Sequence, residues 1–151
     1  MVWIETQAVA SVTVRAELSD VMALLADVPT MGSYAPGVVS IEEVGPREYR
    51  WKMLERKGVG ASFTPDYVCK YRDGGPQEIC FETISGNVKN RGAWRVSSAG
   101  NGKLRLSIEV TTGLDAPVPR LMKKPAELFA RREAQSNLER QLAGIKARLE
   151  R

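Results

Sequence analysis

Apolar and polar residues alternate along most of the first three quarters of the chain, as in β-strands with one buried face. Residues 103–112 show this most clearly, because leucine, isoleucine and valine occupy 104, 106, 108 and 110 while lysine, arginine, serine and glutamate separate them. Other strands are predicted at residues 8–16, 38–44, 47–54, 61–72, 77–84 and 88–97, between turns rich in Gly, Pro and Asn. One-sided alternation predicts an antiparallel sheet with one apolar and one hydrated face.

Two short helical segments are expected after the first strand. Ser19 and Asp20 supply a helix N-cap, and apolar residues then recur at helical spacing up to Val28. Pro29 is expected to end this helix. Residues 30–37 are predicted to form a second short helix or a loop.

The last third of the chain, from about Pro117 to Arg151, predicts one long helix. One face carries an apolar stripe, Leu138, Leu142, Ile145 and Leu149. Continued toward the N-terminus, this face meets Gln135, Arg131 and Leu128, so the stripe becomes polar in the middle. Either this part of the helix is partly solvated, or Arg131 faces a cavity and meets a carboxylate or carbonyl of a ligand, groups that a guanidinium suits.

This helix is the last predicted element, so the preceding strands are expected to cover its apolar side. The predicted fold class is therefore α+β, with a curved antiparallel sheet of about seven strands wrapped around the long C-terminal helix. The length of 151 residues fits one domain spanning 1–151. Such an arrangement often encloses a pocket.

Composition restricts the chemistry. The chain has no histidine, which excludes Ser-His-Asp and Cys-His relays, histidine metal ligands and the commonest general base. The net charge of +4 is mild and spread over the chain, so no nucleic-acid partner is expected.

Neither a signal peptide nor an apolar run long enough to cross a bilayer is evident, and a cytoplasmic location is expected. No metal, cofactor or catalytic set is predicted, and a homodimer is compatible with the sequence.

Two cysteines flank the turn at residues 74–75 symmetrically. A two-residue turn there would place Cys69 directly opposite Cys80 on neighbouring strands. A disulfide is one interpretation of this pair. Free thiols are favoured, because the expected compartment is reducing.

Several short motifs are distinctive: the segments 14–17 and 21–29, Tyr34-Ala35-Pro36-Gly37-Val38, Ser62-Phe63-Thr64, Gly92-Ala93-Trp94 and the terminal helix around 138–146. They resemble the START-like (SRPBCC) superfamily, which has the helix-grip fold and includes Bet v 1, polyketide cyclase/dehydrase-type and Coq10-like proteins. The resemblance covers about residues 8–149. It implies the fold and a pocket between sheet and helix, whereas members of this group differ in activity.

The inward residues of the predicted strands are the expected walls of that pocket: Trp51, Met53, Phe63, Phe81, Trp94, Leu106 and Ile108. Tyr34, Met122 and Phe129 are expected to close it, and Arg131 is the candidate polar contact. Aromatic and methionine surfaces suit a flat or flexible apolar ligand. The alternative for each residue is ordinary core packing. Glu55 has the inward parity of Trp51 but lies near a strand end, where water is the expected environment.

Three functions are consistent with these patterns. The first is a carrier or binding protein for a lipid, quinone or polyketide-like molecule. The second is a polyketide cyclase or dehydratase without metal or histidine, in which Arg131, Glu55, Tyr67 or Tyr71 orients and protonates the substrate. The third is a ribosome- or protein-interaction module of the Coq10-like kind. The absence of an assembled catalytic set favours the first.

Overall fold

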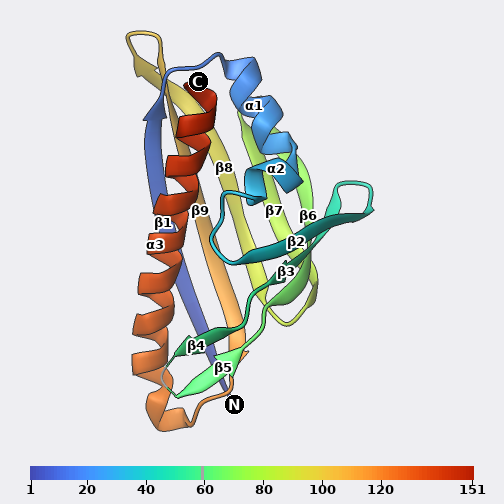
Figure 1. Ribbon diagram of the computed structural model, residues 1–151, viewed down its shortest axis with the longest axis vertical. Helices are drawn as coiled ribbons and strands as arrows, with labels where there is room; N and C mark the ends of the chain where they lie inside the picture. The colour runs from blue at the N-terminus through green and yellow to red at the C-terminus, as the bar shows by residue number, and fades with distance from the viewer. Residues whose placement is uncertain (59) are drawn as a thin grey trace.

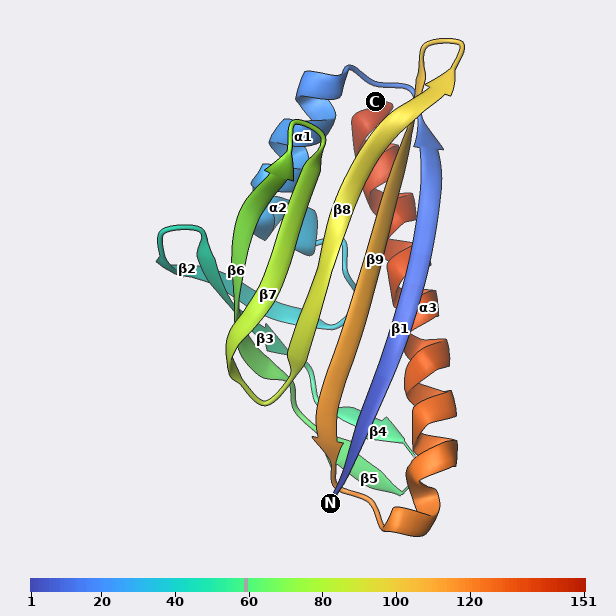
Figure 2. The same ribbon diagram turned by 180° about the vertical axis from the view of Figure 1, so that it is seen from behind.

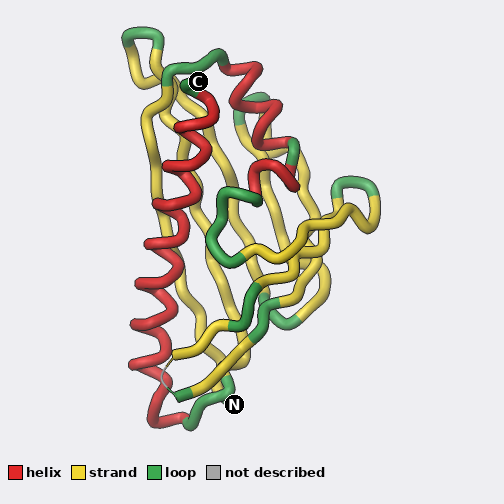
Figure 3. Tube along the Cα trace, in the orientation of Figure 1, coloured by secondary structure: helices red, strands yellow, loops and turns green. Residues whose placement is uncertain are grey.

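The computed structural model describes residues 1–58 and 60–151. Along the chain the elements are β1 (Val2–Val14), α1 (Leu18–Ala26), α2 (Val28–Gly32), β2 (Val38–Gly45), β3 (Glu48–Met53), β4 (Arg56–Gly58), β5 (Ala61–Phe63), β6 (Asp66–Gly75), β7 (Glu78–Gly86), β8 (Lys89–Gly100), β9 (Lys103–Ala116), a 3-10 turn η1 (Arg120–Met122) and α3 (Lys123–Leu149). Helix α3 runs the length of the molecule in front of the sheet, and α1 and α2 lie beside its C-terminal half (Figure 1, Figure 3). The predicted fold class is confirmed.

The main sheet has seven strands in the order β1-β9-β8-β7-β6-β3-β2, and β4 and β5 form a separate hairpin. Every neighbouring pair in the main sheet is antiparallel. Seen from behind, the long strands β8, β9 and β1 curve around α3 (Figure 2). The β8–β9 hairpin closes on Asn101 and Gly102, with φ of 54° and 73°, the left-handed conformation that tight hairpin turns require.

Several strand boundaries differ from the prediction. Strand β1 begins at Val2 rather than near residue 8, because its first inward residues include Thr6 and Ala8, which give a weak hydrophobic signal. The single strand expected over 61–72 is two, β5 and β6, since Pro65 between them cannot donate to a ladder. Strand β4 was not predicted, and the turn expected at 58–60 includes Val59, which lies outside the described residues.

The starts of the two short helices also differ. Glu17, not Ser19 or Asp20, is the N-cap of α1, and Asp20 lies in the first turn, where its charge favours the helix dipole. Pro29 does not end α1, which stops at Ala26, but occupies the first turn of α2. Proline is well tolerated there because that N–H needs no partner.

The cysteines are free, as favoured from the sequence. The turn between β6 and β7 lies later than expected, so Cys69 pairs with Thr83 and Cys80 with Arg72 across the ladder. The expected direct opposition of the two cysteines is therefore wrong.

Helix α3 packs on β1, and its inward face changes composition along the helix. From Leu138 onward the predicted apolar residues are buried, with Leu142 at 2% and Ile145 at 0% exposure. Before Leu138 the inward face continues through Ala134, Ala130 and Ala126, not through Gln135 and Arg131. Arg131 is exposed on the outer side of the helix.

Two hydrophobic cores result. The larger core joins α1, α2 and the C-terminal half of α3 to the sheet and contains Val14, Leu25, Leu106 and Ile145. The smaller core consists of Ile4, Ala116, Val118 and Ala126, at the end of the molecule where α3 begins. Residues of both cores border the same internal space, so the cavity described next lies between them.

Candidate ligand-binding cavity

A cavity of about 300 Å³ lies between the concave face of the sheet and α3. The strands contribute its aromatic wall, and the alanine face of α3 forms the opposite side. It reaches the surface where the β4–β5 hairpin meets the first half of α3, since the lining residues Lys57, Ser62 and Phe129 are exposed there. The cavity exists because small side chains on the helix face large ones on the sheet without filling the space between them.

Most of the predicted wall residues line this cavity. They are Trp51 and Met53 from β3, Phe63 from β5, Phe81 from β7, Trp94 from β8, Ile108 from β9 and Phe129 from α3. In β3, β8 and β9 the regular alternation of the strand decides which side chains point inward. Whether these side chains contact a ligand stays a prediction.

The remaining predicted residues lie elsewhere. The Tyr34 ring packs on Gly144, and its hydroxyl accepts a hydrogen bond from Arg148 Nη1 at 3.3 Å. Met122 packs against the smaller core, and Leu106 is fully buried in the larger one. Arg131 points to solvent because the inward face of α3 follows the alanines, so its expected contact with a ligand inside the cavity is wrong.

Aromatic rings form the inner end of the cavity. Trp51 and Tyr67 are stacked, with centroids 6.2 Å apart and ring planes 8° apart. Tyr71 meets Phe81 at 5.9 Å between centroids. The indole nitrogen of Trp51 is buried and has no hydrogen-bond partner among the residues that the structure describes.

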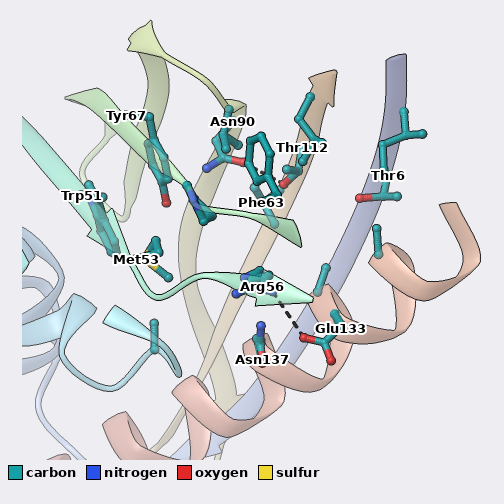
Figure 4. Close-up of a pocket in the computed structure, with 18 of the residues that line it drawn as sticks. Thr6, Trp51, Met53, Arg56, Phe63, Tyr67, Asn90, Thr112, Glu133 and Asn137 are labelled. Carbon is teal, nitrogen blue, oxygen red and sulfur yellow. Dashed lines mark hydrogen bonds and ion pairs between the residues drawn. The ribbon is translucent and has the colours of Figure 1, made fainter. Parts of the chain in front are cut away.

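Arg56 is the cationic group of the cavity that contacts the helix. Its Nη1 donates to Glu133 Oε2 on α3 at 3.4 Å, as the dashed line in Figure 4 marks. With the Asn137 amide oriented so that its oxygen faces the guanidinium, that oxygen accepts from Nη2 at 3.0 Å and from Nη1 at 3.2 Å. Glu133 and Asn137 are four residues apart on one helix face, so both reach the same partner.

A second polar group lies on the sheet side of the cavity (Figure 4). Thr112 Oγ1 on β9 donates to Asn90 Oδ1 on β8 at 2.7 Å, and the Asn90 backbone N–H donates to Thr83 Oγ1 at 2.8 Å. Tyr67 extends from β6 toward the same space. Asn90 shares the inward parity of Trp94, which the sequence indicates, whereas Thr112 and Thr6 gave no signal.

Burial keeps the reactive groups at the inner end protonated. Desolvation raises the pKa of Tyr67 far above its ordinary value, so its hydroxyl remains a hydrogen-bond donor at neutral pH. Desolvation also raises the pKa of the Cys69 thiol to about 11, against a smaller opposing effect from the Thr83 hydroxyl. Neither group is an activated nucleophile at neutral pH.

The polar cavity residue that follows β3 is Arg56, which sequence reasoning missed. Glu55 is exposed and pairs with Lys57 at 3.6 Å, which agrees with the expectation that it lies in water. Arg56 points into the cavity instead, because β3 ends at Met53 and the chain re-enters strand conformation at Arg56 with the opposite parity. Glu133 and Asn137 were missed because the inward face of α3 was misassigned.

The described residues contain no group of three or more metal-ligating side chains, and none of the described helices is long and apolar enough to cross a membrane.

The family model "Polyketide cyclase / dehydrase and lipid transport" matches residues 5–150. The chain belongs to this family. Membership supports a role in ligand binding or cyclisation, and it confirms the START-like resemblance seen in the motifs. A search of curated proteins found no match.

Solved structures show the same fold over almost the whole chain. A protein from Thermus thermophilus matches with a TM-score of 0.73 and 18% identity, covering 95% of this chain and 96% of that one. A START superfamily protein from Mycobacterium smegmatis matches at 0.72 and 14%, covering 95% and 96%. The Zhui aromatase/cyclase from a Streptomyces species matches at 0.62 and 16%, covering 96% and 93%. At these identities the likeness shows the fold alone.

Proposed function

We propose that this protein binds a hydrophobic small molecule with a planar or ring-containing body and at least one oxygen function, and acts as its carrier or binding protein. The observation that carries the proposal is the cavity between aromatic sheet residues and the alanine face of α3. Its volume of about 300 Å³ is at the lower end of the range of ligand pockets, about 300–1,000 Å³. Trp51, Phe81 and Trp94 supply flat apolar surfaces, which suit rings.

The polar groups favour a ligand with oxygen atoms near the mouth. A guanidinium binds carboxylates and carbonyls with directed hydrogen bonds, and Arg56 presents one beside the opening. Its present partner Glu133 is 46% exposed, so the ion pair is screened by water and a ligand oxygen can compete for Arg56 at small cost. At the inner end, the Tyr67 hydroxyl supplies a donor that a carbonyl or hydroxyl of the ligand would satisfy.

A direct test blocks the cavity from the helix side. Ala134 lines the cavity, so Ala134→Phe places a ring inside it, whereas Ala143→Phe puts the same ring on an exposed position of the same helix. The wild-type protein and Ala143→Phe are expected to bind members of a panel of lipids, quinones and aromatic polyketides. Ala134→Phe is expected to lose at least tenfold in affinity, measured by quenching of tryptophan fluorescence and by native mass spectrometry. Equal affinity in both variants, or a panel in which nothing binds the wild type, would contradict the proposal.

A second candidate is a cyclase or dehydratase reaction in the same cavity. Family membership and the Arg56–Glu133 pair favour it, because Arg56 could polarise a carbonyl while the Glu133 carboxylate accepts a proton from the adjacent carbon. Glu133→Gln separates the two functions. Turnover of a linear poly-β-ketone that falls more than a hundredfold in Glu133→Gln, with binding retained, would establish the enzyme. Binding without turnover in the wild type would establish the carrier.

A further inference from the structure

The chain leaves the sheet through a corner that exposes an apolar side chain among cations. We define this η1 corner as residues 120–124, Arg120-Leu121-Met122-Lys123-Lys124. Leu121 is 94% exposed, more than any other large apolar residue in the described chain, and η1 buries none of its residues. Met122 is half-buried against the smaller core, so it fixes the corner to the fold while Leu121 projects from it.

The charged residues of the η1 corner itself are all cations. Arg120, Lys123 and Lys124 are all exposed, and none forms an ion pair within the described residues. The first half of α3 adds Arg131 and Arg132 on its outer side, and Glu127 is the only acidic residue between 120 and 132. Cations without local partners attract an anionic surface, and an apolar side chain among them can enter the layer below that surface.

The corner also lies beside the cavity mouth. Both views place η1 and the start of α3 at the same end of the molecule as the β4–β5 hairpin, away from the C-terminus (Figure 1, Figure 2). Leu128 and Phe129, which are 45% and 39% exposed, follow within two turns of the helix, and Phe129 lines the cavity. Exposed apolar residues therefore recur between Leu121 and Phe129 at the opening. Val44, another exposed apolar residue, instead follows two acidic residues, Glu42 and Glu43.

We propose that the η1 corner docks this protein on an anionic lipid surface, with Leu121 inserted into the headgroup region and Arg120, Lys123 and Lys124 over anionic headgroups. The cavity mouth then lies close to that surface, where an apolar ligand can pass between bilayer and cavity without crossing water. An acidic protein is the competing occupant. The projecting leucine favours a lipid layer, because a protein partner would need a pocket shaped to receive it.

Co-sedimentation with vesicles tests the proposal. The wild-type protein is expected to bind vesicles of phosphatidylcholine with about 30% phosphatidylglycerol at about 0.05 M salt, and to be released at about 0.5 M. Pure phosphatidylcholine vesicles are expected to bind it at least tenfold more weakly. Leu121→Ser is expected to reduce partitioning roughly tenfold, and the double variant Lys123→Gln/Lys124→Gln roughly 25-fold, since each cation contributes about fivefold.

Matched variants test whether vesicle binding depends on the η1 corner. Val44→Ser changes an exposed apolar residue on β2, and Arg105→Gln/Arg140→Gln removes two exposed cations elsewhere; both should partition like the wild type. Ala134→Phe should also bind vesicles normally, so failure of the cavity proposal and failure of docking are distinguishable. Wild-type protein that stays in the supernatant, or corner variants that sediment like the wild type, would overturn the proposal. Leu121-dependent retention on immobilised polyglutamate without vesicle binding would assign the corner to an acidic protein and overturn it equally.

Discussion

Gly92 shows how a single residue fixes the shape of the sheet beside the cavity. It lies on β8 opposite Val110, where β8 and β9 approach closely. A Cβ at this position would overlap the carbonyl oxygen of Glu109 and come within 2.9 Å of Phe81 Cζ. The Gly-x-Trp motif noted in the sequence thus has a physical basis. Gly92 leaves room for the backbone of β9 and for the Phe81 ring, and Trp94, two positions later, is buried.

This geometry makes a prediction about stability. Gly92→Ala should lower the free energy of unfolding by about 1–3 kcal/mol, because the backbone of β9 must move to accept a methyl group. Gly75→Ala is the control, since a methyl group added there would have no neighbouring atom within 4 Å, and it should change stability by less than about 0.5 kcal/mol. Urea unfolding followed by circular dichroism measures both. Similar stability of the two variants would show that β9 yields without cost.

At the same scale, sequence patterning identifies inward residues only while a strand stays regular. Trp51, Trp94 and Ile108 were assigned to the cavity wall from alternation alone, and all three line it. Arg56 was missed because the chain leaves strand conformation between Met53 and Arg56, and parity cannot be carried across such a break. The break has no strong sequence marker, since Leu54-Glu55 contains neither Gly nor Pro.

At the scale of elements, the division of the inward face of α3 into a leucine-rich and an alanine-rich segment explains why there is both a core and a cavity. Leucine and isoleucine fill the space against the sheet from Leu138 onward, whereas the alanines before it leave space unfilled. The leucine stripe was predictable because its spacing is unambiguous. The alanine stripe could not be predicted, because alanine is common on every face of a helix. Going back from Leu138, a step of four residues reaches Ala134 and a step of three reaches Gln135, and both steps fit a helix equally well.

Two leucines of α3 test this division. Leu142 is 2% exposed and Leu128 is 45% exposed. Leu142→Ala should lower the free energy of unfolding by about 2–5 kcal/mol, through lost burial and the space left behind. Leu128→Ala, the same change on the outer face, should cost less than about 1 kcal/mol. Chemical unfolding of both variants measures the difference, and comparable losses would mean that the N-terminal half of α3 also supports the core.

At the scale of the whole molecule, the cavity mouth is closed by the least supported part of the fold. The β4–β5 hairpin forms no part of the main sheet, and a two-stranded hairpin alone is marginally stable in water. Two described contacts hold it to α3. The Phe129 ring lies against Gly58, where a Cβ would come within 2.5 Å of Cε1, and Arg56 pairs with Glu133 and Asn137. The same hairpin carries Phe63 into the cavity, so opening it would open the path for a ligand.

This arrangement predicts selective opening at the mouth. Glu133→Gln weakens the tie between β4 and α3, and an exposed ion pair contributes up to about 1 kcal/mol, so amide hydrogen exchange in residues 56–63 should accelerate up to about fivefold. Exchange in β8 and β9 should not change, because the main sheet does not depend on the pair. Glu127→Gln is the control, because it removes from the same helix a charge that takes part in no described ion pair. Exchange in residues 56–63 of this variant should match the wild type. Acceleration spread evenly over the sheet would show that Glu133 supports the whole fold. Unchanged exchange in the β4–β5 hairpin would show that its packing and the Asn137 contact hold it in place without the ion pair.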